Sequence, residues 1–193
     1  WHIKDLMKRE TPMVVVDPYP TEIARRAKIW LRVRPGTDAA LAIGILNILI
    51  SEDLYDHEFV ENWTYGFEQL KERCREYPVD KVSQITDVPA EKIIEAAHFI
   101  ASVKPLSLEW GPAFEQSENS AAACRSIFMI PALTGNWDVP GGFVESLEIA
   151  YPLPPLQADR DHVGNRRPLR PGAISRFDAP FAHPYYVFEA WIC

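Results

Sequence analysis

Cysteine is scarce in this sequence, and the spacing of its three cysteines excludes the common cysteine-based sites. Cys74, Cys124 and Cys193 lie far apart, and no two of them form a C-x-x-C pair. The chain therefore carries neither a disulfide framework nor a zinc or iron–sulfur signature of its own. We expect Cys74 and Cys124, which lie within helical patterns, to serve as small core residues.

Long apolar runs and an excess of positive charge are also lacking. No stretch approaches the roughly 18 uninterrupted apolar residues of a membrane span, so we expect no span in this segment. Acidic residues outnumber basic ones, 27 against 20, which gives a formal net charge of −7. That balance argues against nucleic acid as the main partner. The histidines share no spacing, and we predict none of them to be a metal ligand: His2, His57, His98, His162 and His183.

The first predicted strand is not followed by a G-x-G-x-x-G motif, so an ordinary NAD site loses its main support. Residues 11–22 read TPMVVVDPYPTE instead. The apolar run Met13–Val16 is typical of a buried strand in a parallel sheet. It ends at a carboxylate, Asp17, and Pro18 and Pro20 hold the exit extended. An acid in this position predicts either a tight turn or a ligand contact.

Strands and helices alternate through the first fifty residues. Thr21–Lys28 predicts a brief helix with Thr21 as its N-cap, and residues 29–34 predict the next strand. The PGTD turn at 35–38 leads into Ala39–Ile50, an apolar helix that we expect to be buried on nearly every side. This order predicts an α/β fold with a mainly parallel sheet.

Helical patterns continue to Lys104, with Asp87 as the expected cap of the last of these helices. LSLEW at 106–110 predicts a return to strand, and the following residues predict a helix that contains Pro131. Ligands of parallel α/β sheets bind outside the carboxyl ends of the strands. We therefore expect Asp17, the PGTD loop and residues 110–112 to share one edge of the sheet.

Two aspartates at that edge fit a purine nucleoside. A carboxylate at a strand end, such as Asp17, accepts hydrogen bonds from a pair of ribose hydroxyls. Asp38, beside the free N–H groups of a helix start, matches the N1–H and N2–H₂ donors of guanine. The alternatives stay open, because Asp38 could be a plain helix cap and Asp17 a turn acid.

Three segments together resemble the interior of a known enzyme family. They read VVVDPYPTEIARRAKIWLRVRPGTDAALAIGILNILI, LYDHEFVENWTYGFEQLKE and WGPAFEQSENSAAACRSIFMIPALTGNWDVPGG. In order and spacing they are similar to the molybdopterin oxidoreductases of the dimethyl sulfoxide reductase family, over roughly residues 10–145. The resemblance implies a Rossmann-like sheet with flanking helices, as an interior fragment of the central domains of a larger enzyme.

The same resemblance implies a molybdopterin guanine dinucleotide with molybdenum or tungsten. It also implies a four-iron, four-sulfur cluster and a direct metal ligand outside this segment. Positions that would lie against the guanosine are Asp17, Pro18, Tyr19, Pro20 and Thr21. Positions that would contact the guanine are Gly36, Thr37 and Asp38. Positions that would approach the pterin and metal are Gly111, Pro112 and Gln116.

Some residues depart from the family pattern. The family commonly reads Asp-Pro-Arg where this chain has Tyr19, which puts a charge contact to phosphate at that point in doubt. The family's Gly-Met-Gly is Gly111-Pro112-Ala113 here, a stiffer loop. Arg125 matches a substrate-pocket arginine of formate dehydrogenases, and its alternative is a surface or salt-bridged arginine.

These patterns divide the chain into three parts and leave several functions open. Residues 1–108 are expected to form part of a dinucleotide-binding domain with a helical insertion, 109–150 a strand, loop and helix leading to a neighbouring domain, and 151–193 a proline-rich irregular segment. We expect a two-electron redox enzyme fragment whose partners are the rest of its own polypeptide and an iron–sulfur electron-transfer subunit. An acetylene hydratase-like hydration, a non-catalytic nucleotide-binding module and a scaffold subunit are the alternatives.

Overall fold

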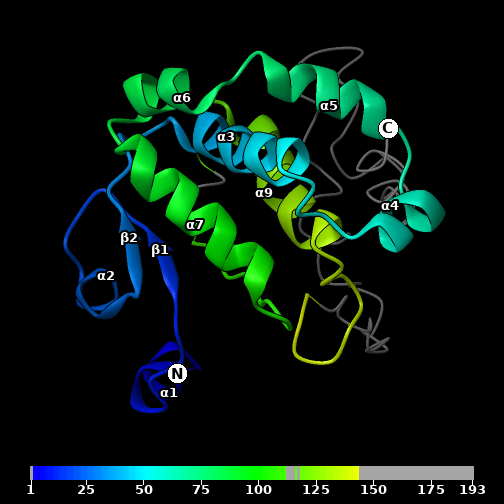
Figure 1. Cartoon of the computed structure of the whole chain (residues 1–193). Coiled ribbons are helices and arrows are strands. Elements are labelled where there is room, and N and C mark those ends of the chain that lie inside the picture. The colour runs from blue at the N-terminus through cyan, green and yellow to red at the C-terminus, as the bar shows by residue number, and fades with distance from the viewer. Residues whose placement is uncertain (1, 112–115, 117, 144–193) are drawn as a thin grey trace, which may run out of the picture. The chain divides into compact units, whose positions relative to one another are not determined.

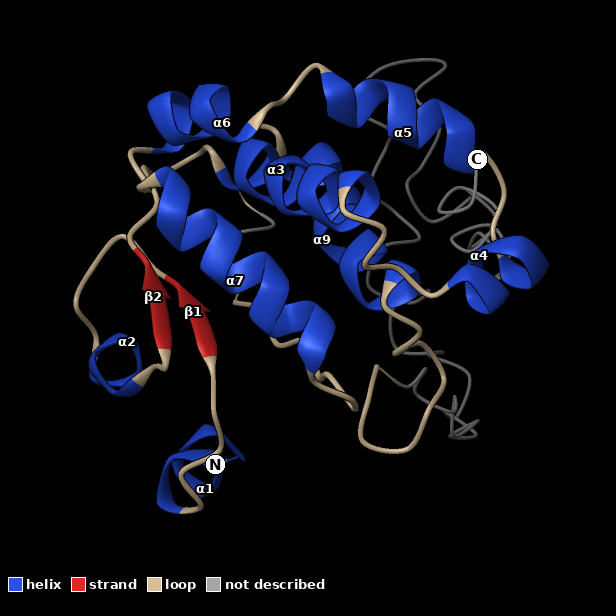
Figure 2. Cartoon of the chain, viewed as in Figure 1, coloured by secondary structure: helices blue, strands red, loops and turns tan. Residues whose placement is uncertain are grey.

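The computed structural model describes residues 2–111, 116 and 118–143, and this part of the chain consists mainly of helices beside a small parallel sheet (Figures 1 and 2). Strand β1 (Val14–Val16) pairs with β2 (Ile29–Leu31), with Val14 opposite Ile29 and Val16 opposite Leu31. The short helix α1 (His2–Lys8) precedes the sheet. No described helix has the length and apolar character needed to cross a membrane.

The β–α–β unit forms as the sequence predicts. Helix α2 (Glu22–Arg26) connects the two strands, and the Thr21 hydroxyl caps it by accepting a hydrogen bond from the Ala24 amide at 3.3 Å. The Trp30 indole N–H donates to the Asp17 carbonyl at 2.9 Å. The unit is therefore closed at its carboxyl end by a side chain of one strand and the backbone of the other.

Helix α3 (Asp38–Ser51) forms the centre of the described region (Figure 1). It packs against α5, α6, α7 and α9, so little of its surface is left for solvent. Leu46 and Leu49 are fully buried, as is the β2 residue Leu31. This confirms the prediction, because a helix without a polar face is stable only when it is covered on all sides.

In the described residues, five further helices follow α3 along the chain. They are α4 (His57–Trp63), α5 (Phe67–Arg75), α6 (Val79–Thr86), α7 (Ala90–Ser102) and α9 (Ser120–Leu133). Helix α7 also contacts β2 and lies beside the two-stranded sheet (Figure 2). The helix predicted around Pro131 is confirmed, since α9 continues through this proline to Leu133.

Three expectations need correction. Residues 106–110 form no strand: the Leu106 amide donates to the Asn136 side-chain oxygen at 2.8 Å, and no described strand lies beside it to pair with. Asp87 does not cap α7; it ends α6 in the left-handed conformation, with φ of 61°. The sheet has two strands in the described residues, so helices dominate where a mainly parallel sheet was expected.

The predicted division of the chain stays a prediction. The proline-rich segment 151–193 lies outside the described residues, as does part of 109–150.

Candidate functional site

The parallel register of the two strands defines the candidate site. Because Val16 lies opposite Leu31, the residues that follow them, Asp17 and Arg32, leave the sheet at the same edge. The Asp17 amide donates to the Leu31 carbonyl at 3.2 Å, which continues the ladder by one residue. The PGTD loop follows β2 by a few residues and leads into α3. The register therefore places Asp17 and the segment that leads from β2 into the PGTD loop at the carboxyl edge. Residues 110–112 were expected at the same edge because a strand was predicted before them, and residues 106–110 form no strand. A shared edge for all three segments stays a prediction.

Asp17 holds its own turn together. One carboxylate oxygen accepts from the Tyr19 amide at 2.8 Å, and the other accepts from the Thr21 hydroxyl at 3.1 Å. The Thr21 hydroxyl in turn caps α2. The turn reading of Asp17 is therefore correct, and it leaves room for a ligand because each carboxylate oxygen can accept a second hydrogen bond. Contact with a ribose stays a prediction.

Two arginines follow β2 at its carboxyl end, and they differ in their partners. Arg34 makes a bidentate ion pair with Asp87, with distances of 2.7 Å and 2.6 Å. This pair raises the pKa of Arg34 and lowers the pKa of Asp87, mainly through the side-chain hydrogen bonds. Arg32 instead donates its Nε–H to the Pro18 carbonyl at 3.3 Å. The sequence predicts only a strand over residues 29–34, and a partner 53 residues away cannot be read from a local pattern.

The start of α3 has unused hydrogen-bonding capacity. Thr37 is the N-cap by position, but its hydroxyl donates to the Arg34 carbonyl at 2.7 Å and makes no cap bond. The half-buried Asp38 side chain has no hydrogen-bonding or ionic partner within the described ranges. Gly36 has φ of 81°, with open space where a Cβ would stand. The Asp38 carboxylate and the first backbone amides of α3 are therefore available to a ligand.

The remaining predicted residues lie at the surface. The Tyr19 side chain is 70% exposed, and Gly111, Gln116 and Arg125 are exposed as well. Trp110 packs edge-on against Phe128 of α9, with ring centroids 4.9 Å apart. Pro112 lies outside the described residues. No described distance brings Arg125 to the edge that carries Asp17, so its place in a substrate pocket stays a prediction.

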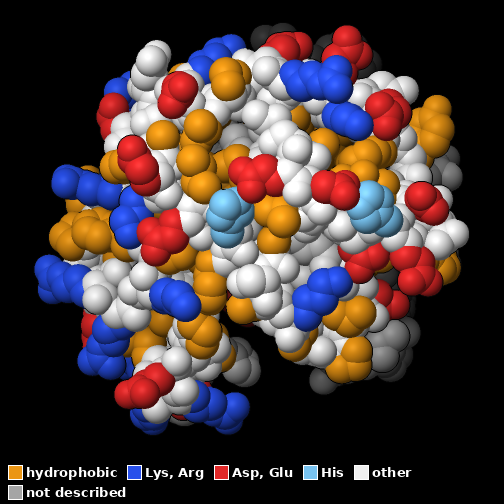
Figure 3. Space-filling view, viewed as in Figure 1, with side chains coloured by type: hydrophobic (Ala, Val, Ile, Leu, Met, Phe, Trp, Pro, Cys, Tyr) orange, Lys and Arg blue, Asp and Glu red, His pale blue; other side chains and the backbone are white. Residues whose placement is uncertain are grey.

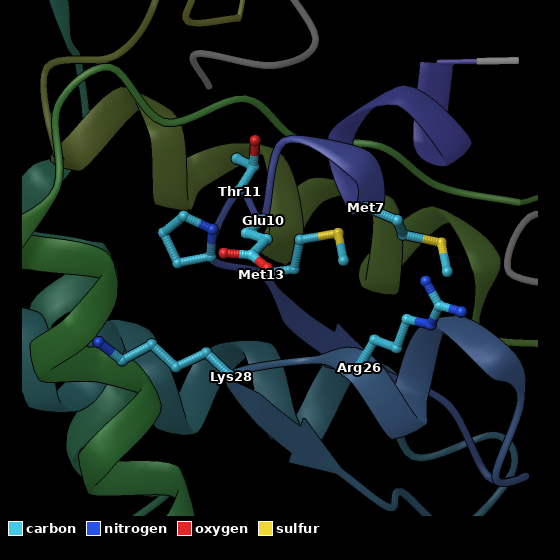
Figure 4. Close-up of a pocket in the computed structure, with 7 residues that line it drawn as sticks. Met7, Glu10, Thr11, Met13, Arg26 and Lys28 are labelled. Atoms are coloured by element: carbon cyan, nitrogen blue, oxygen red, sulfur yellow. The ribbon is translucent and has the colours of Figure 1, made fainter.

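A hollow in the described region does not coincide with the candidate site. It has a volume of about 410 Å³ and lies at the amino ends of the strands, between Met13, which precedes β1, and Lys28, which precedes β2. Figure 4 shows Arg26 and Met7 pointing toward each other on one side of it, whereas Lys28 extends away on the other. No cluster of three potential metal ligands occurs among the described residues, at this hollow or elsewhere. Its position opposite the carboxyl edge makes it a poor candidate for the nucleotide site.

Positive charge is concentrated near the sheet. Residues 1–34 contain eight Lys and Arg against four Asp and Glu, although the whole chain has a net charge of −7. On the face drawn in Figure 3, Lys and Arg side chains gather over α1 and α2. An acidic chain with a basic β–α–β unit is suited to an anionic ligand at that unit.

Comparison with known proteins places these features in a family. Residues 2–168 match the family described as molybdopterin oxidoreductase. The chain belongs to this family. It is 45% identical over 135 residues to acetylene hydratase of Syntrophotalea acetylenica and 34% identical over 169 residues to the dimethyl sulfoxide reductase DmsA of Escherichia coli. These alignments cover 70% and 76% of this chain, and 18% and 20% of the relatives.

A solved structure shows the same fold. Acetylene hydratase from Pelobacter acetylenicus superposes with a TM-score of 0.67 at 46% identity, over 69% of this chain and 18% of that chain. The helix-rich region with its small parallel sheet is therefore a molybdopterin oxidoreductase fold. The chain spans about a fifth of the length of these relatives. The predicted resemblance to the dimethyl sulfoxide reductase family is confirmed.

Proposed function

We propose that this chain is the part of a molybdenum or tungsten enzyme that binds the guanine nucleotide end of molybdopterin guanine dinucleotide. The observation that carries the proposal is the parallel pairing of β1 and β2, because it brings the Asp17 turn and the loop before α3 to one edge. Nucleotides bind at this edge in open α/β sheets. On the same grounds we propose that these two strands are part of a Rossmann-like domain in the whole protein.

The described residues fit such a nucleotide. The Asp38 carboxylate is without a hydrogen-bond donor in the part of the chain that the structure describes. Two adjacent acceptors in one plane suit the N1–H and N2–H₂ groups of guanine, whereas adenine offers no such pair. The uncapped first turn of α3 leaves amides for phosphate or base oxygens. Asp17 would add a contact to the ribose through the unused lone pairs of its carboxylate.

This placement gives the cofactor and the polypeptide different roles. When bound, the cofactor would supply two-electron chemistry at its metal, while the polypeptide binds and orients it. Asp38 would select guanine, Asp17 would hold the sugar, and residues Gly111 and Gln116 would lie toward the pterin. The iron–sulfur cluster and an electron-transfer subunit belong to this proposal as features of the whole enzyme.

The proposal predicts that Asp38→Asn weakens cofactor retention. One carboxylate oxygen becomes an NH₂ group, which faces a guanine donor and cannot accept its hydrogen bond. The whole polypeptide that carries this segment should be purified from cells grown with molybdate and with tungstate. Released GMP and oxidised pterin, measured per polypeptide, should fall severalfold in the variant. Unchanged GMP and pterin would remove Asp38 from the site.

Asp17→Ala is the matched comparison at the same edge. We expect a smaller loss of GMP, because backbone groups share the contacts to a ribose. This variant also loses the Tyr19 and Thr21 hydrogen bonds, so its free energy of unfolding must be measured alongside. A loss of GMP equal to that of Asp38→Asn, at unchanged stability, would reverse the ranking of the two residues.

A hydratase is the second candidate function, and the 45% identity to acetylene hydratase favours it. Hydration differs from a two-electron redox reaction because it adds water to a carbon–carbon triple bond without net transfer of electrons. The purified enzyme should therefore be assayed for acetaldehyde formation from acetylene, and separately for reduction of dimethyl sulfoxide by a dye donor. Turnover of acetylene alone would decide for the hydratase, and turnover of the sulfoxide alone for the redox enzyme.

A further inference from the structure

We propose that Arg32 binds the diphosphate of the nucleotide at the carboxyl edge of the sheet, taking over a charge that the segment after β1 does not supply. This inference rests on the proposed function and names a binding residue within the same site. It starts from a missing charge: the turn after β1 reads Asp17-Pro18-Tyr19, and Tyr19 carries no positive charge. A dianionic diphosphate at this edge would need a cation from elsewhere.

Arg32 lies where such a cation is needed. It directly follows β2, and its Nε–H donates to the carbonyl of Pro18 in the turn after β1. The guanidinium group is thereby tied to the segment that holds Asp17, although it comes from the neighbouring strand. Only Nε is used in this bond, so the N–H donors of both terminal nitrogens are left for a ligand. A planar fork of this kind is suited to bidentate contacts with phosphate oxygens.

The cations that flank β2 on either side of Arg32 are engaged elsewhere. Arg34 is neutralised by its bidentate pair with Asp87. Arg26 pairs with Glu22 at 3.0 Å and lines the hollow at the opposite edge, where Lys28 lies over the Phe99 ring at 4.4 Å. Arg32, by contrast, is exposed and pairs with no carboxylate of the described residues. Its charge is thus available at the carboxyl edge.

The exposed Tyr19 side chain suggests how the two positions are related. Because 70% of it is accessible, an arginine could replace it without disturbing packing. A cation at position 19 and a cation at position 32 would approach the same turn, one from β1 and the other from β2. A single positive charge at this turn would then serve the diphosphate, and either position could provide it.

The test compares four variants of the whole polypeptide, isolated with its cofactor. Arg32→Gln removes the charge and keeps a hydrogen-bonding side chain, and Arg32→Lys keeps the charge without the planar fork. Arg34→Gln is the matched control, because it removes a neighbouring arginine whose charge is already paired. Tyr19→Arg combined with Arg32→Gln moves the charge to the other strand. The readouts are GMP and oxidised pterin per polypeptide, and the rate of their loss on dilution into buffer.

We expect Arg32→Gln to lose nucleotide about tenfold faster than the unmodified protein, the typical effect of one charge-assisted hydrogen bond. Arg32→Lys should be intermediate, and the double variant should return toward the unmodified rate. Higher salt should shrink the difference between Arg32→Gln and the unmodified protein, because the contact is exposed. Arg34→Gln should lower the thermal midpoint of unfolding, because it breaks the pair with Asp87. Its rate of nucleotide loss should stay close to that of the unmodified protein.

Three outcomes would overturn the inference. They are equal loss rates for Arg32→Gln and the unmodified protein, equal loss from Arg32→Gln and Arg34→Gln, or no recovery in the double variant. An unmodified protein that contains pterin without a guanine nucleotide, or neither, would overturn the proposed function itself, which separates the two failures.

Discussion

Among single residues, Asp56 connects three segments that lie far apart in the sequence. One carboxylate oxygen accepts from the Phe59 amide at 3.0 Å and caps α4, and the other accepts from Lys104 at 2.9 Å. The Asp56 amide donates to the Leu133 carbonyl at the end of α9 at 2.6 Å. We predict that Asp56→Ala lowers the free energy of unfolding at pH 7 by about 1 kcal/mol through the lost cap. Urea unfolding followed by circular dichroism measures this difference.

The contribution of Asp56 to the free energy of unfolding should be lost in acid. The Phe59 amide, and after it Lys104, lowers the pKa of this carboxyl from its ordinary value of 3.8. A group whose pKa is lower in the folded state adds stability above the unfolded pKa and loses it as the pH falls through the folded one. The gap between the unmodified protein and Asp56→Ala should thus be constant at neutral pH and shrink below pH 3.8. Asp56→Asn keeps a capping oxygen and is the control; a gap as large as that of Asp56→Ala would assign the effect to Lys104.

At this scale the sequence located the candidate residues but not their partners. Asp17 was predictable because a β-branched run ends at an acid that is followed by Pro18 and Pro20, which is a local signal. Its hydrogen bonds with the Tyr19 amide and the Thr21 hydroxyl are also local, and a turn acid was one of the two alternatives. The Arg34–Asp87 pair and the bond from Arg32 to Pro18 join positions 53 and 14 residues apart. Such contacts depend on how strands and helices pack, which no short window of sequence contains.

For the helices, the contact between α3 and α6 offers the sharpest test of packing. A Cβ added at Gly44 would lie 2.8 Å from a Cγ atom of Val82, a fully buried residue with a stiff, branched side chain. We predict that Gly44→Ala lowers the free energy of unfolding by about 1 kcal/mol, because overpacking of 1–3 kcal/mol outweighs the gain in helix propensity. Val82→Ala alone should also destabilise, by leaving a cavity.

The double variant Gly44→Ala with Val82→Ala completes this cycle. The new methyl group would occupy space that the valine vacates, so the double variant should be less destabilised than the sum of the single ones. Chemical denaturation of all four proteins gives the coupling energy. Simple additivity would show that α6 moves away from α3 without cost and that Gly44 is not a packing requirement.

Elements with a strong local signal were predictable, and those that depend on a neighbour were not. The apolar run of α3 and the Thr21 cap of α2 are encoded within a few residues. Residues 106–110 have strand-like composition, but a strand also needs a partner backbone. In the described region the Leu106 amide finds the Asn136 side chain instead. The fold class was predicted in outline, whereas the dominance of helices over a two-stranded sheet was not.

Across the whole described region, stability is centred on one core around α3, and Cys74 provides a probe of that core. This residue of α5 is fully buried among the core side chains, and burial raises the pKa of its thiol to about 11. The thiolate is the reactive form of cysteine, so a buried thiol with this pKa should be inert in the folded protein at pH 8.

We predict that iodoacetamide modifies Cys74 only when the core opens as a unit. Its labelling, followed by mass spectrometry of the Cys74 peptide, should rise with urea along the same curve as the loss of helical circular dichroism. Cys124, which is only half-buried on α9, serves as the internal comparison and should react at lower urea. If Cys74 reacts in buffer as fast as Cys124, then α5 opens independently of α3 and the described helices do not share a single cooperative core.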